Sequence, residues 1–68
     1  MEKGWILVWT VKKEYLAELI KKMLADHDIQ AVSINKKDSS YTSFGDIEIY
    51  VKEENHLKAR TLIKEFEE

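Results

Sequence analysis

The sequence predicts a two-layer α+β sandwich, in which two helices cover one face of a three-stranded antiparallel sheet. Two segments repeat apolar residues at the helical period. Three shorter segments are rich in β-branched or aromatic residues, as strands are. The chain has no proline and only two glycines, so nearly every residue falls in one of these elements. Its 68 residues suffice for one small domain, and no linker divides residues 1–68.

The first strand is predicted over residues 5–11, and both of its faces are apolar. In regular alternation, Ile6 and Val8 share one face. The other face then carries Trp5, Leu7 and Trp9. A single layer of helices can bury only one of these two faces, so this strand has more apolar surface than the fold can cover.

The first helix is predicted over residues 13–26. Its apolar stripe consists of Leu16, Ile20, Met23 and Leu24, flanked by Ala17 and Leu19. The helix is expected to stop at His27 and Asp28. Asp28 then takes the left-handed conformation that glycine usually adopts at this position.

Two further strands are predicted over residues 29–35 and 46–52, joined by a polar loop over 36–45. In the earlier strand, Val32 and Ile34 alternate with smaller or polar residues, so one face is apolar. The later strand has the cleaner alternation. Its inward residues are Ile47, Ile49 and Val51, and its outward residues are Asp46, Glu48, Tyr50 and Lys52.

The second helix is predicted over residues 54–66, after an acidic, cap-like start at residues 53–55. Its buried stripe is expected to contain Ala59, Leu62, Ile63 and Phe66. The resulting order, β-α-β-β-α, is a ferredoxin-like split βαβ sandwich that lacks its last strand. The expected sheet order is 1-3-2, with the first strand at an edge.

The composition limits the class of partner. The net charge is −2 and the isoelectric point is about 5.7, so the chain lacks the basic surface typical of nucleic-acid binders. It has no cysteine, and no stretch approaches the ~20 apolar residues of a membrane span. We therefore expect a cytoplasmic protein that binds neither nucleic acid nor membrane.

An aromatic patch is the strongest candidate for a binding site. If Ile6 and Val8 face the helices, the patch on the uncovered sheet face consists of Trp5, Leu7, Trp9 and Tyr50. Exposed apolar patches of this kind mark interaction surfaces, and aromatic residues are favoured anchors. Two alternatives remain. The tryptophans could pack inward with Ile6 and Val8 facing outward, or terminal residues could fold over the patch.

The loop and the histidines are weaker candidates. Hydroxyl and ammonium groups suited to an anion or to phosphoryl modification come from Lys36, Lys37, Ser39, Ser40 and Tyr41. An ordinary solvated hairpin loop explains the same residues and is favoured. His27 lies between two aspartates, but neighbouring side chains do not converge on one metal ion. We expect no metal and no cofactor. No phosphate-binding loop or nucleophile motif indicates an enzyme.

Several segments resemble a family of small bacterial domains of unknown function, described as a "putative signal transducing protein" and grouped by fold with PII-like signalling proteins. The matching segments are Val8-Trp9-Thr10, Ala17-Glu18-Leu19-Ile20, Leu24 with Ile29-Gln30-Ala31, Ile47-Glu48-Ile49-Tyr50-Val51, and Glu53-Glu54 with Lys58-Ala59. The family usually has glycine where this chain has Asp28. The resemblance implies the fold and a signalling role, but it carries over no binding residue.

These observations predict a non-enzymatic binding or regulatory module that acts through self-association or through a protein partner on the open sheet face. A homodimer is expected, and the first strand could also pair through its free edge. The alternative is a sensor of a small ligand, a nucleotide or an amino acid, with a cleft near loop 36–45. That alternative rests on fold analogy with PII-like domains.

Overall fold

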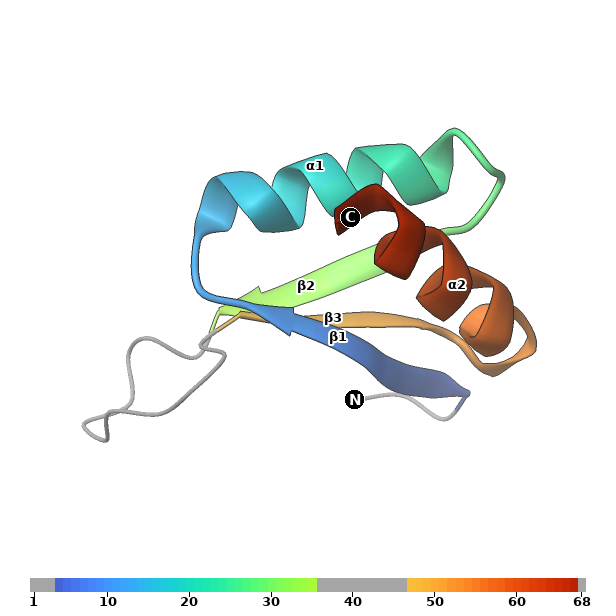
Figure 1. The fold of residues 1–68 in the computed structure, drawn as a ribbon. Helices are drawn as coiled ribbons and strands as arrows, with labels where there is room; N and C mark the ends of the chain where they lie inside the picture. The colour runs from blue at the N-terminus through green and yellow to red at the C-terminus, as the bar shows by residue number, and fades with distance from the viewer. Residues whose placement is uncertain (1–3, 36–46, 68) are drawn as a thin grey trace.

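The computed structural model describes residues 4–35 and 47–67. Its elements are β1 (Trp5–Val11), α1 (Glu14–Ala25), β2 (Ala31–Asn35), β3 (Ile47–Lys52), the short 3-10 turn η1 (Glu53–Asn55) and α2 (His56–Glu67). The strands form one antiparallel sheet in the order β1-β3-β2, and both helices lie on the same side of it (Figure 1). The predicted two-layer α+β fold and its strand order are therefore confirmed.

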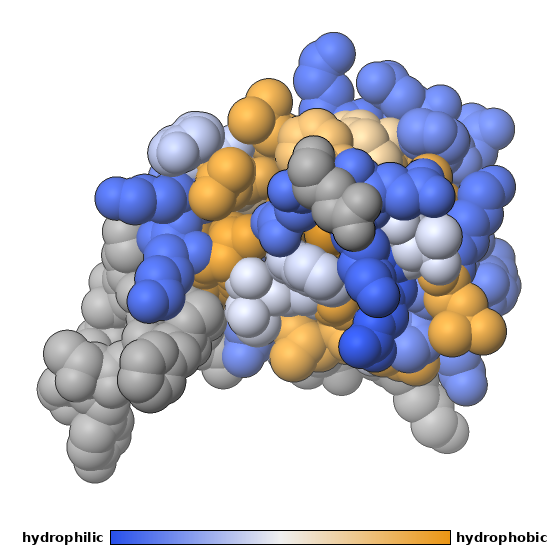
Figure 2. Space-filling model, viewed as in Figure 1, coloured by the Kyte–Doolittle hydropathy of each residue, from blue (hydrophilic) through white to orange (hydrophobic). Residues whose placement is uncertain are grey.

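The core is built on the central strand β3. Its inward side chains, Ile47, Ile49 and Val51, are almost completely buried, as the alternation predicts. The helices add Ala17, Ile20 and Leu24 from α1, and Ala59 and Ile63 from α2. The core is completed by Val8 and Val11 of β1 and by Ile29. Hydrophobic side chains come to the surface in the seam between α1 and α2, where the two helices meet (Figure 2). The buried residues of both helices therefore pack against the same face of the sheet.

Strand β2 turns its small side chains toward the helices. Ala31 pairs with Val51 and Ser33 pairs with Ile49, and paired residues of antiparallel strands share a face. These small residues leave room for α1, which contacts β2 directly. Val32 and Ile34 therefore point away from the helices. The predicted alternation of β2 is present, and its apolar side belongs to the uncovered face.

Strand β1 contains a bulge that changes the predicted faces. Leu7 pairs with Tyr50, but the next pair is Trp9 with Ile49, so Val8 is an extra residue. Val8 is only 7% exposed, and Trp9 packs against the core cluster. The expectation that Trp9 shares a face with Trp5 and Leu7 is therefore wrong. Regular alternation fails because the extra residue reverses the side on which every later side chain lies.

Helix α1 ends as the sequence predicts. Asp28 has a φ of 64°, the left-handed conformation, although it is not a glycine. The N–H groups of His27 and Ile29 both donate to the carbonyl oxygen of Leu24, at 2.9 Å. These bonds satisfy a carbonyl that the helix itself leaves unpaired. The turn delivers Ile29 into the core just before β2 begins.

Helix α2 buries less than predicted. Ala59 and Ile63 are fully buried and Leu62 packs against them, but Phe66 is 42% exposed. Phe66 lies in the last turn, beyond the buried middle turns of the helix, so its predicted place in the core is wrong. Leu57, in the first turn, is 77% exposed.

We predict that Ile49→Val lowers the free energy of unfolding by about 0.5–1.5 kcal/mol, because the lost methylene leaves a small cavity in a fully buried site. Urea denaturation measures the change. Leu57→Ala is the control. It removes more of a side chain, but from an exposed position, and should cost less than about 0.5 kcal/mol. Equal losses for the two variants would contradict the assigned core.

We predict opposite effects for glycine at two neighbouring aspartates. Asp28→Gly should raise the unfolding free energy by roughly 0.5 kcal/mol, because it relieves a side chain held at positive φ. Asp26→Gly should lower it by about 0.5–1 kcal/mol, because Asp26 has ordinary helical geometry, with a φ of −65°. Thermal denaturation of both variants tests this prediction. A loss of stability in Asp28→Gly would show that the positive φ of Asp28 is not strained.

Candidate functional site

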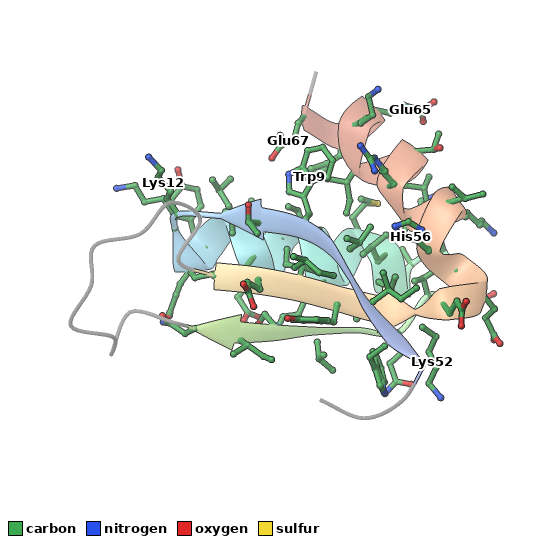
Figure 3. All side chains as sticks on the ribbon, turned by 90° about the horizontal axis from the view of Figure 1, so that it is seen from below. Trp9, Lys12, Lys52, His56, Glu65 and Glu67 are labelled. Carbon is green, nitrogen blue, oxygen red and sulfur yellow. The ribbon has the colours of Figure 1, made fainter. Side chains whose placement is uncertain are left out.

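The candidate site is the side of the sheet that faces away from the helices, which we call the open face. Its members, fixed by strand register, are Trp5, Leu7 and Thr10 of β1, Val32 and Ile34 of β2, and Glu48, Tyr50 and Lys52 of β3. Figure 3 looks onto this face from below. None of the described helices or strands lies over it, since both helices pack on the opposite side (Figure 1).

The open face has an apolar centre. Leu7 and Val32 pair with Tyr50 from opposite sides, so the three side chains form one row across the sheet, which we call the central row. Leu7 is 42% exposed, and Val32 and Tyr50 are half-buried. An apolar centre with polar groups around it, which none of the described helices or strands covers, is typical of an interaction surface.

Charged groups flank the central row on either side. At one end Lys52 pairs with Trp5, and its Nζ atom lies 5.5 Å from the centre of the indole ring, within cation–π range (Figure 3 labels Lys52). At the other end Glu48 lies between Thr10 and Ile34. The face therefore carries a positive group at one end and a negative group at the other.

A hydrogen bond joins the central row to the acidic end. The hydroxyl of Tyr50 donates to Oε1 of Glu48 at 2.9 Å. This bond, partial burial and the negative charge of Glu48 together raise the pKa of Tyr50 above its ordinary value. The phenol is thereby kept neutral and held in place on the face.

Of the four patch residues predicted from the sequence, three come together on the open face: Trp5, Leu7 and Tyr50. Trp9 does not join them and instead lies beside the C-terminal part of α2 (Figure 3). There it borders a shallow hollow of about 270 Å³ at the edge of β1, together with Leu7, Val8, Thr10 and Arg60. Sequence reasoning missed Val32 and Ile34. The signal was present in the small residues that alternate with them, which suit a close helix contact.

The other candidates remain predictions. Lys36, Lys37, Ser39, Ser40 and Tyr41 lie outside the described residues, as does the cleft expected near them. His27 uses its Nδ1 atom locally, 2.9 Å from the carbonyl oxygen of Met23. Among residues 4–35 and 47–67, no three His, Asp or Glu side chains gather closely enough to hold a metal ion.

The strand order and the two helices on one side of the sheet define a small α+β domain of ferredoxin-like arrangement with an open sheet face. The family model described as "Putative prokaryotic signal transducing protein" matches residues 5–67, so the chain belongs to that family. The resemblance expected from the sequence is thereby confirmed. No curated protein and no solved structure matches the chain. Neither described helix has the length and apolar character needed to cross a membrane.

We predict that Tyr50 ionises at higher pH than an ordinary tyrosine, and that Glu48→Gln lowers its pKa. The hydrogen bond favours the neutral phenol in the folded state. The stability that this hydrogen bond contributes is therefore fully present below the ordinary tyrosine pKa. It is lost as the pH rises through the raised pKa of Tyr50 in the folded protein. Phenolate absorbance during an alkaline titration, with Tyr50→Phe subtracted, isolates this group. An unchanged titration in Glu48→Gln would rule out the assigned partner.

Proposed function

We propose that this chain is a non-enzymatic binding module in prokaryotic signalling, which acts in the cytoplasm by docking its open face onto a protein surface. The family description supports a signalling role. The central row of Leu7, Tyr50 and Val32 is the single observation that carries the assignment of the face.

The energetics favour covering this face. Completely burying one large aliphatic or aromatic side chain contributes roughly 1.5–3 kcal/mol. Leu7 and the half-buried residues beside it can still lose exposed apolar area, whereas the core side chains of β3 have none left to lose. On the helix layer, the exposed apolar residues of α2, Leu57 and Phe66, lie at opposite ends of the helix, and Tyr15 and Leu19 form an exposed pair one turn apart on α1. Neighbouring residues of the open face are instead joined by strand pairing.

A protein partner fits this face better than a nucleic acid. Trp5 and Tyr50 could stack on bases, as sheet aromatics do in RNA-binding domains of similar topology. However, Glu48 lies on the same face and is hydrogen-bonded to Tyr50, so its charge would oppose phosphates there. The overall charge of −2 acts in the same direction.

Site-specific photo-crosslinking in cells tests the proposal. A photoreactive phenylalanine analogue replaces Leu7 on the open face or, as the matched control, Leu57 on α2, which is the more exposed leucine. We predict a discrete protein adduct from position 7 and none from position 57. Adducts at both positions, or at neither, would show that the open face is not a specific contact surface.

A further inference from the structure

We propose that the occupant of the open face is a second copy of this chain, related by a two-fold axis that runs across the strands through the central row. The inference rests on the proposed function and names its partner. Two sheets would pack face to face, with the β3 strands antiparallel to each other, as in an aligned β-sandwich.

The charges of β3 are self-complementary about Tyr50. Glu48 and Lys52 lie on the open face, each two residues from Tyr50, so they are roughly equal distances of about 6.6 Å from it along the strand. A two-fold rotation about an axis across the strands exchanges the two ends of the face. Lys52 of one copy then lies over Glu48 of the other, and the symmetry produces two such pairs.

The alternative face-to-face symmetry is electrostatically unfavourable. An axis parallel to the strands leaves each end of β3 over the same end of its copy. Glu48 would then face Glu48 of the other copy, and Lys52 would face Lys52. Like charges brought together at an interface oppose association and suppress the wrong geometry. The charge pattern thus selects one of the two arrangements.

The apolar groups fit the same arrangement. The central row lies on the axis, so Leu7, Tyr50 and Val32 each pack against the same residue of the other copy. The phenol of Tyr50 keeps its hydrogen bond to Glu48 in this arrangement. The Nζ atom of Lys52 lies over the Trp5 ring, 5.5 Å from its centre, at the rim of the face.

Pairing through the edge of β1 is the less favourable route to a dimer. The bulge at Val8 interrupts the regular ladder of β1, and bulges on edge strands hinder the addition of another strand. We therefore favour a dimer that packs face to face over one that pairs through the edge of β1, which the sequence also allows.

The size of the face sets the expected affinity. Three strands about 4.8 Å apart and six residues at about 3.3 Å each give a footprint of roughly 14 by 20 Å. Such a contact is smaller than the roughly 1,000 Å² that a stable specific interface buries, so the association is a weak and transient one. The dimer should therefore form in the micromolar range or above, and should dissociate on dilution.

Charge reversal tests the arrangement by sedimentation velocity from micromolar to millimolar concentration. Glu48→Lys and Lys52→Glu should each raise the dissociation constant by about ten-fold or more, because each converts both cross-copy attractions into repulsions. The double variant should return to the wild-type value. An equimolar mixture of the two single variants should form a heterodimer, which also shows that both variants are folded.

Two controls separate this effect from overall charge. Glu65→Lys and Lys64→Glu on α2 change the net charge by the same amounts, and should leave the dissociation constant unchanged. Single reversals without effect, or a double variant that is not restored, would overturn the proposed axis. A chain that stays monomeric at millimolar concentration would overturn the dimer itself. If position 7 still forms an adduct in cells, the proposed binding function survives that result with a different partner.

Discussion

The structure depends on a geometric constraint: two helices on one side of a three-stranded sheet can cover only one of its faces. The central strand β3 meets this constraint by strict alternation, with Ile47, Ile49 and Val51 buried beneath the helices. Its alternate residues, from Glu48 to Lys52, necessarily lie on the open face. In a chain of 68 residues the core is small, so apolar side chains on the second face represent a large unused share of the available burial energy.

The two edge strands accommodate the constraint in different ways. In β2, Ala31 and Ser33 lie on the helix-facing side, where their small side chains allow α1 to approach. The larger Val32 and Ile34 lie on the open face. In β1 the bulge at Val8 brings Trp9 to the helix side, while Trp5 and Leu7 stay on the open face. The open face therefore becomes more aliphatic and less rich in tryptophan than regular alternation suggests. Among residues 4–35 and 47–67, the charged members of this face, Glu48 and Lys52, both come from β3.

The fold was predictable because its signals are local and periodic. The alternation of β3, the stripe of α1 and the left-handed stop at Asp28 each follow from short-range sequence patterns, and each is present. The site was only partly predictable. A bulge is a property of the pairing between two strands, so the sequence of β1 alone could not reveal that Trp9 changes sides. The outward direction of Val32 is signalled in the sequence only by the small residues that alternate with it. Their effect depends on how closely α1 packs, which is a tertiary effect rather than a propensity.

The central claim is that the open face is covered when copies of the chain meet. Methyl NMR with a soluble paramagnetic agent tests it most directly, by reporting the solvent contact of single side chains across a dilution series. We expect the methyl groups of Leu7 and Val32 to be protected at high concentration and to become accessible on dilution. Ile49 should stay protected and Leu57 should stay accessible throughout, as their burial requires. If the solvent accessibility of the Leu7 and Val32 methyl groups does not change across the dilution series, copies of the chain do not cover the open face.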